Sequence, residues 1–181
     1  MVEKGMKFKL LKLIEKFTYA AATNVWPNSG SLLNYITENK LTKKSKLQVI
    51  GKGSSNGINL SRFNNRQLKP EVIDEIKTQI NYSAGNTYLL FMGRLVKDKG
   101  IVELINAFTA IQPSRPALRL LLVGDFEQTL DPLPNHITEI IKNNDAVIHI
   151  SWTNKVEYFM NIADSFVFPS HREGFPNVLL Q

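Results

Sequence analysis

The chain has 181 residues, of which 43% are apolar and none is cysteine, so disulfides, thiolate nucleophiles and cysteine-ligated metals are excluded. Its formal net charge is +6, and much of the excess lysine lies before Lys46, which indicates an acidic or phosphorylated partner surface. No apolar run approaches the roughly 20 residues of a membrane-spanning helix, and the N-terminus lacks the pattern of a signal peptide, so we expect a cytoplasmic protein.

The N-terminal part of the chain predicts two helices. Residues 7–22 place apolar side chains three and four positions apart, opposite a face rich in lysine, which is the pattern of an amphipathic helix. Either Asn28 or Ser29 can cap a second helix that we expect to end near Lys40. The first helix has two interpretations. Its apolar face packs against a neighbouring domain, which we favour, or its lysines bring it to an anionic membrane at the inner face.

A break in regular structure separates this part from the rest. Residues 47–50 are predicted to form a strand, and residues 51–70 a hinge or linker without a clear period. The glycines of residues 51–57 lack the spacing of a dinucleotide-binding loop, and no lysine followed by serine or threonine ends the segment. We therefore interpret these residues as a flexible crossing rather than a phosphate loop, with a helix following at residues 71–79.

From residue 88 onward, apolar runs and amphipathic segments alternate. We expect strands at residues 88–92, 118–123, 146–150 and 165–168, and helices at residues 101–110, 134–142 and 156–162. This alternation predicts a parallel sheet, and the continuously apolar strands predict that helices cover both of its faces. The fold class is therefore α/β, with a Rossmann-like doubly wound parallel sheet. A further helix is expected from Pro176, so the fold is predicted to be truncated at residue 181.

Polar and glycine residues follow each predicted strand. They are Gly93-Arg94, Gly124-Asp125, Ser151-Trp152 and residues 169–174. Because the carboxyl ends of parallel strands meet at one edge of a sheet, we expect these groups to converge. Gly93 lets a ligand approach the backbone, while Arg94 and Lys99 supply the positive charge that a diphosphate needs. The alternative is an ordinary turn at Gly93 with solvated surface charges, and this pattern alone leaves both interpretations open.

The segment around Glu173 has two interpretations as well. A carboxylate just ahead of a helix stabilises the helix dipole by about 0.3 to 1 kcal/mol. It can also bind sugar hydroxyls, with Gly174 and Pro176 leaving backbone amides for a phosphate or hydroxyl. His171 lies in the same loop and is a candidate ligand contact. The three histidines, His136, His149 and His171, do not have the spacing of metal ligands, so no metal site is expected.

Several of these segments together resemble a known family. They are Gly93-Arg-Leu, Asp98-Lys-Gly100, Leu122-Val-Gly124, Ala163-Asp164, Phe168-Pro-Ser170 and Glu173-Gly-Phe-Pro-Asn-Val-Leu-Leu180. In this order and at these intervals they resemble the donor-binding domain of family 4 glycosyltransferases of the GT-B type, whose two Rossmann-like domains face a cleft. More weakly, residues 24–29 and 46–59 resemble the acceptor domain of enzymes that build bacterial surface polysaccharides. The resemblance implies an acceptor-domain remnant at 1–50, an interdomain crossing and linker helix at 51–87, and a nucleotide-sugar-binding domain at 88–181.

The resemblance implies a role for each candidate residue. The positions of Arg94 and Lys99 bind the nucleotide diphosphate and neutralise the leaving group, and the position of Glu173 contacts the donor sugar. Amides at Gly174 and Phe175 approach sugar and phosphate, and the loops at Gly93, Gly124, Asp125, Ser151 and Trp152 border the donor. The resemblance further implies retention of the anomeric configuration, no metal, and no cofactor besides a donor substrate such as a UDP-sugar.

The chain departs from the family pattern at two points. The family has a second glutamate where this chain has Gln181, so binding of the ribose hydroxyls there depends on an amide without charge. The rest of the acceptor domain and the end of the donor domain are absent from these 181 residues. We therefore expect that the fragment alone can bind donor without turnover.

These observations predict a retaining hexosyltransferase fragment acting on a glycan or polyprenyl-linked acceptor in surface polysaccharide synthesis. The alternative is a non-catalytic nucleotide-sugar-binding module or an inactive relic. Nucleic-acid binding is disfavoured, because the basic residues do not alternate with aromatic ones along a surface stripe.

Overall fold

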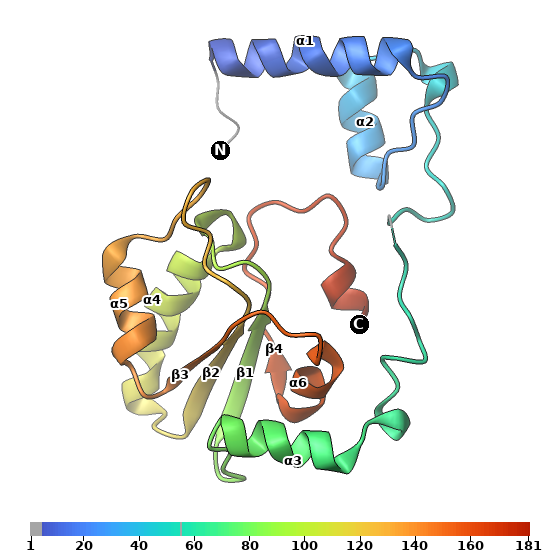
Figure 1. The fold of residues 1–181 in the computed structure, drawn as a ribbon. Helices are drawn as coiled ribbons and strands as arrows, with labels where there is room; N and C mark the ends of the chain where they lie inside the picture. Colours follow the sequence, from blue (N-terminus) through green and yellow to red (C-terminus); the bar gives the residue numbers. More distant parts are fainter. Residues whose placement is uncertain (1–4, 55) are drawn as a thin grey trace. The chain divides into compact units, whose positions relative to one another are not determined.

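The structure, a computed structural model, describes residues 5–54 and 56–181. The chain divides into two compact units. One comprises residues 1–58 together with residues 173–180, and the other comprises residues 59–172 together with Gln181. Each unit is built around its own helices, and the larger one contains the sheet (Figure 1).

The larger unit contains a four-stranded parallel sheet, as the sequence predicts. Its strands are β1 (Thr87–Met92), β2 (Leu118–Val123), β3 (Val147–Ile150) and β4 (Ser165–Phe166), in the order β3-β2-β1-β4. Leu120 lies in register with Leu89 on one side and with Val147 on the other. Because all the strands are parallel, their carboxyl ends lie at one edge of the sheet.

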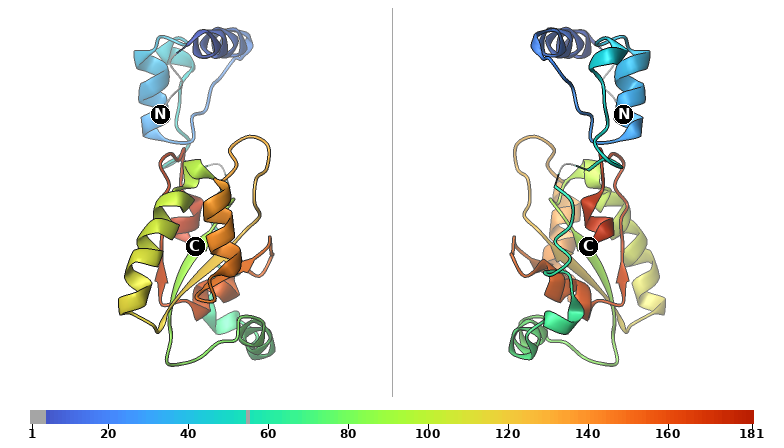
Figure 2. Two further views of the ribbon diagram at one scale, coloured as in Figure 1. Left: turned by 90° about the vertical axis from the view of Figure 1, so that its left-hand side faces the viewer. Right: turned by 90° about the vertical axis from the view of Figure 1, so that its right-hand side faces the viewer.

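Helices cover both faces of this sheet. They are α3 (Pro70–Gln79), α4 (Ile101–Ile111), α5 (Asn135–Asn143) and α6 (Val156–Ile162). The two views of Figure 2 show α4 and α5 together on one face and α3 and α6 on the other. The chain crosses the sheet between β3 and β4, so the strand order reverses beside β1, and ligands of doubly wound folds bind at such a point. The predicted fold class is therefore confirmed.

The strands are apolar on both faces because both faces are buried. On the α4 and α5 face, Phe91, Leu120 and Leu122 are at most 1% exposed and pack in one cluster with Ile105 and Ile137. The alternate residues Tyr88, Leu90 and Leu121 point to the opposite face and are equally buried. Each fully buried side chain of this size contributes roughly 1.5 to 3 kcal/mol. The rigidity of the strand ends depends on this core.

The smaller unit contains the two N-terminal helices, α1 (Met6–Ala21) and α2 (Gly30–Glu38). The predicted cap is confirmed at Ser29, whose Oγ accepts a hydrogen bond of 3.2 Å from the Leu32 amide. The ammonium group of Lys46 donates to the carbonyls of Tyr19, Ala20 and Ala22 at 3.3, 3.0 and 2.7 Å. It thereby satisfies carbonyl groups at the C-terminus of α1, where a positive charge is also favoured by the helix dipole.

Three predicted elements differ from the structure. Residues 47–50 do not form a strand, because only Leu47 has a partner, Val25, in an isolated bridge. Strand β4 ends at Phe166 rather than at residue 168, although the Val167 amide still donates to Leu90 at 2.8 Å. The helix expected from Pro176 is a short 3-10 helix, Asn177–Leu180, closed by a bond from the Leu179 amide to the Pro176 carbonyl.

Two further results concern the linker and the search for membrane-spanning helices. The described residues of the predicted linker up to residue 69 have no regular structure apart from a 3-10 turn, Asn65–Gln67, and α3 begins at Pro70. In the part of the chain that the structure describes, no helix is both long and apolar enough to cross a membrane.

Candidate functional site

Two glycines let the ends of β1 and β2 come into contact. Gly93 and Gly124 have backbone φ values of 145° and 141°, which residues other than glycine rarely adopt. A Cβ atom on Gly124 would lie 2.8 Å from the carbonyl carbon of Gly93 and would collide with its oxygen. The amides of both glycines donate to the neighbouring strand, to Val123 and Ile150 at 3.0 and 2.8 Å. The strand ends therefore form a tight layer of backbone that a ligand can approach closely.

The segment after Gly93 carries the predicted cations. Arg94 is exposed, whereas the next two residues, Leu95 and Val96, are at most 1% exposed and anchor the loop in the core. A 3-10 turn, η3 (Lys97–Lys99), then leads into α4. Lys99 is half-buried in this turn. Buried side chains before it and a helix after it thus restrain the backbone that carries Lys99.

The loop after β4 packs against this turn. Gly100 has a φ of 70°, and a Cβ atom there would lie 2.8 Å from the carbonyl carbon of Pro169. The His171 amide donates to the Asp98 carbonyl at 3.0 Å, and its ring Nε2 lies 3.2 Å from Glu103 Oε1. The ligand-binding role of His171 stays a prediction, since its ring already contacts Glu103.

The loops after β2 and β3 are joined by Asp125. Its Oδ1 accepts a hydrogen bond of 2.9 Å from the Trp152 amide, and the Leu95 amide donates to its carbonyl at 2.9 Å. The indole of Trp152 is 73% exposed. His149 lies in β3, with Nε2 2.8 Å from the Gly124 carbonyl and its ring against Phe126, so its contacts are structural.

The loop after β2 contains an acidic residue, Glu127, that is held by Thr129. The pKa of Glu127 lies below its ordinary value, mainly because the Thr129 hydroxyl donates to its carboxylate at 2.7 Å. The Thr129 amide, at 3.0 Å, and the charge of Arg94 lower it further. The ionised form of the Glu127 carboxylate is thereby favoured, mainly by Thr129.

Two acidic residues that the sequence analysis did not select hold the turn that carries Lys99. Asp131 Oδ2 accepts the Asp98 amide at 2.7 Å, and its Oδ1 lies 3.7 Å from Lys97 Nζ. The Asp98 carboxylate accepts from the Arg172 guanidinium at 3.0 Å. Asp98 could have been found, because it begins one of the segments that carry the family resemblance. Asp131 lies in a loop without a motif or period, so the sequence contained no signal for it.

The larger unit brings most of the predicted site residues to one edge of the sheet. These residues are Gly93, Arg94, Lys99, Gly124, Asp125, Ser151, Trp152 and His171. Gln181 lies elsewhere in this unit, in a recess of about 240 Å³ beside α6 whose other walls include Phe63, Leu68 and Met160. The role of Gln181 in binding ribose stays a prediction.

The smaller unit contains Glu173, Gly174 and Phe175. In this unit, a Cβ atom on Gly174 would lie 3.0 Å from Asn28 Nδ2, and one on Gly53 would lie 3.4 Å from the Phe175 ring. The segment after Glu173 therefore packs on the loop before α2 and on the crossing segment. The roles of these three residues, and the approach of Glu173 to Arg94 and Lys99, stay predictions.

Comparison with known proteins identifies the family. The family model described as "Glycosyl transferases group 1" matches residues 72–181. The capsular polysaccharide biosynthesis glycosyltransferase CapM of Staphylococcus aureus is 35% identical over 178 residues, which are 98% of this chain and 45% of that protein. The putative teichuronic acid biosynthesis glycosyltransferase TuaC of Bacillus subtilis is 32% identical over 127 residues, 69% of this chain and 28% of that protein.

Solved structures show the same fold. Anabaena HepE in complex with UDP and glucose superposes with a TM-score of 0.75 at 19% identity, over 95% of this chain and 45% of that one. WaaG, a glycosyltransferase involved in lipopolysaccharide biosynthesis, gives a TM-score of 0.73 at 20% identity, over 98% of this chain and 48% of that one. The chain thus spans less than half the length of each of these proteins, and its sheet has the fold of the C-terminal domain of GT-B glycosyltransferases. From the sequence and the fold together, the chain belongs to the group 1 glycosyl transferases.

Proposed function

We propose that this chain is the donor-binding part of a retaining glycosyltransferase that acts in bacterial surface polysaccharide synthesis. The observation that carries the proposal is the site at the switch point of the sheet, where Gly93 and Arg94 follow β1 and the turn of Lys99 packs against the loop after β4. Parallel α/β sheets bind nucleotides at this point. The names of the relatives from Staphylococcus aureus and Bacillus subtilis support a role in surface polysaccharide synthesis, because they refer to the biosynthesis of capsular polysaccharide and of teichuronic acid.

In the proposed reaction, the bond between the anomeric carbon of the sugar and the diphosphate oxygen breaks. A hydroxyl oxygen of the acceptor bonds to the same face of that carbon, and its proton passes to the departing diphosphate. Arg94 and Lys99 neutralise the charge that develops on this leaving group, so no metal ion is required for that task. Positioned donors of this kind contribute roughly 10² to 10³ each in rate. Glu173 holds hydroxyls of the donor sugar, with the amides of Gly174 and Phe175 beside it.

We further propose that the donor is a uridine diphosphate sugar whose nucleoside lies along Asp125, Ser151 and Trp152. The exposed indole of Trp152 and the polar groups beside it suit a base and a ribose. HepE, whose structure contains UDP and glucose, shares the fold. The acceptor is proposed to be a glycan or a polyprenyl-linked sugar at the inner face of the membrane, because a Campylobacter jejuni relative is named for transfer to a diphospho-undecaprenol acceptor.

A second candidate function is donor binding without transfer. Both candidates require a nucleotide-sugar site, and they differ only in turnover. Release of free UDP from a UDP-sugar in the presence of acceptor glycans distinguishes transfer from binding.

The proposed site is tested by thermal denaturation with and without a uridine diphosphate sugar. We expect the ligand to raise the melting temperature, since it binds only the folded protein. Lys99→Ala should remove most of this increase. The matched control is Lys142→Ala, which removes an exposed lysine from α5 that pairs with Glu139 at 3.8 Å. Equal increases for the parent and Lys99→Ala would exclude Lys99 from the site, and no increase for the parent would contradict the proposed function.

A further inference from the structure

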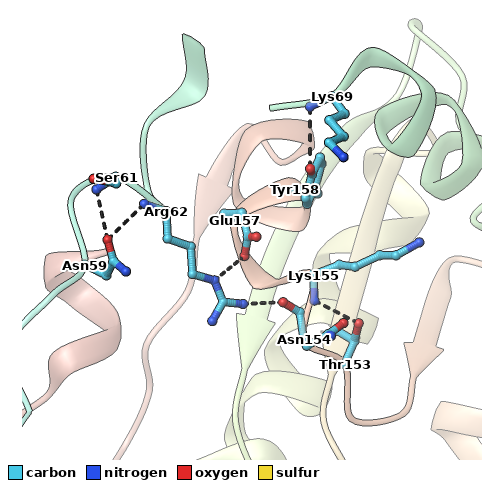
Figure 3. Close-up of polar contacts among 9 residues, drawn as sticks. All are labelled: Asn59, Ser61, Arg62, Lys69, Thr153, Asn154, Lys155, Glu157 and Tyr158. Carbon is cyan, nitrogen blue, oxygen red and sulfur yellow. Dashed lines mark hydrogen bonds and ion pairs between the residues drawn. The ribbon is translucent and has the colours of Figure 1, made fainter. Parts of the chain in front are cut away.

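Arg62 connects the linker to the loop between β3 and α6 (Figure 3). Its guanidinium Nε donates to Glu157 Oε2 at 2.9 Å, and one terminal nitrogen donates to the backbone carbonyl of Asn154. The Glu157 side chain is only 14% exposed, whereas that of Arg62 is 40% exposed. The pair is thus partly shielded from solvent, where a charge-assisted bond is stronger than at the open surface.

The backbone of Arg62 is held by contacts that do not involve its side chain. Asn59 Oδ1 accepts hydrogen bonds from the amides of Ser61 and Arg62 at 3.1 and 3.2 Å, which closes a local turn (Figure 3). The Phe63 amide also donates to the Asn59 carbonyl, at 3.1 Å. Because this turn restrains the backbone, less conformational entropy is lost when the guanidinium binds Asn154 and Glu157.

The loop of residues 151–154 is therefore held from both sides. The Asp125 carboxylate accepts the Trp152 amide at 2.9 Å on one side, and Arg62 binds the Asn154 carbonyl on the other. Thr153 Oγ1 accepts the Lys155 amide at 3.1 Å, which joins the loop to the start of α6. Trp152, which is 73% exposed, is itself bound through its amide at one of these attachments and lies two residues before the other.

We infer that Arg62 is a positioning residue that orders the loop of residues 151–154 for the nucleoside of the donor. The inference rests on the proposed function, because that loop borders the nucleoside only if the chain binds a nucleotide sugar. Arg62 itself does not touch the ligand in this account. It acts through the Asn154 carbonyl and sets the orientation of Trp152.

The ordering role can be measured without any ligand. The chain has two tryptophans, Trp26 and Trp152, so Trp26→Phe leaves Trp152 as the single tryptophan, which can be excited selectively over the tyrosines. In that background, Arg62→Ala should lower the fluorescence anisotropy of Trp152 and increase its quenching by acrylamide. The matched control is Glu75→Gln, which removes another ion pair of 2.9 Å near the start of α6, with Lys155, but leaves the loop carbonyl bonded. Unchanged anisotropy and quenching in Arg62→Ala would overturn the inference.

The nucleoside part is tested by comparing two ligands in binding titrations, UDP and inorganic diphosphate. Arg62→Ala should weaken UDP binding by up to roughly tenfold, because UDP binding must then also order the loop, and leave diphosphate binding unchanged. Lys99→Ala should weaken both. A looser Trp152 with unchanged UDP affinity would overturn the inference while leaving the proposed function intact, whereas a parent that binds neither ligand would contradict the proposed function.

A conservative variant tests whether the effects of Arg62→Ala arise from a general folding defect. Arg62→Lys keeps the positive charge but cannot span Glu157 and Asn154 with one planar group. It should keep the circular dichroism spectrum of the parent and restore only part of the anisotropy. Full restoration by lysine would show that charge alone is sufficient, which contradicts the proposed bond to the Asn154 carbonyl.

Discussion

The carboxylate of Asp98 accepts a hydrogen bond of 3.0 Å from the guanidinium of Arg172, which lies 74 residues later in the chain. The same aspartate accepts the His171 amide at its carbonyl, at 3.0 Å, and donates its own amide to Asp131 at 2.7 Å. Asp98 therefore joins the turn that carries Lys99 to the loop after β4. The orientation of Lys99 depends on residues that do not themselves need to contact a ligand.

Asp98→Asn is expected to affect binding more than stability. The Asp98 and Arg172 side chains are 46% and 72% exposed, so the change should cost less than about 1 kcal/mol of unfolding free energy. Affinity for UDP should fall several-fold, because the turn of Lys99 loses one attachment. Chemical denaturation and calorimetric titration measure the two effects. Glu139→Gln, which breaks an exposed pair on α5, is the control, and an equal loss of UDP affinity in both variants would contradict the prediction.

Gly124→Ala is expected to be strongly destabilising. Its φ of 141° and the collision of the new Cβ with the Gly93 carbonyl both oppose the substitution. A residue held in such a strained conformation costs roughly 1 to 3 kcal/mol, and relief of the collision requires the two strand ends to separate. Urea denaturation should show the loss. Gly85→Ala is the control, because the nearest atom to a Cβ there is Ser83 Oγ at 3.9 Å, and similar midpoints for both variants would refute this account.

Glu173→Gln is expected to separate sugar binding from nucleotide binding. If Glu173 contacts hydroxyls of the donor sugar, the amide should weaken binding of a UDP-sugar and leave binding of UDP nearly unchanged. The ratio of the two dissociation constants, from competition titrations, is the quantity to compare. Glu71→Gln, in the first turn of α3, serves as the control. An unchanged ratio in Glu173→Gln would exclude this residue from contact with the sugar.

The low pKa of Glu127 leads to a prediction about acid stability. Because the folded pKa is lower than the unfolded one, the ionised carboxylate stabilises the fold above the unfolded pKa, about 4.3, and this contribution is lost as the pH falls through the folded pKa. Thr129→Ala removes the main cause and should raise the pKa of Glu127. Carbon NMR of the carboxyl group across the pH range measures it. Thr138→Ala, whose hydroxyl bonds the Pro134 carbonyl, should leave this pKa unchanged.

Agreement between sequence and structure was best where the pattern is local. The bounds of β2 and α6 were predicted correctly. The apolar run of β2 and the periodic pattern of α6 are each complete within a few consecutive residues, so no distant partner is needed to recognise them. The cap at Ser29 was predicted for the same reason, since it requires only the amide of Leu32 three residues later. Residues 47–50 have an equally apolar pattern, yet a strand also requires a partner, and only Leu47 has one.

The parallel sheet, and thus the edge at which Gly93, Arg94 and Trp152 lie, could be inferred from the alternation of apolar strands with amphipathic helices, whereas the strand order came from the structure. The tertiary structure alone decided which side chains hold that edge. Arg62 and Glu157 are 95 residues apart, and Asp98 and Arg172 are 74 apart. The periodicity of the sequence indicates which face of its own helix or strand a side chain occupies. Such pairs, in contrast, form only when the folded sheet brings loops that are distant in the sequence close together.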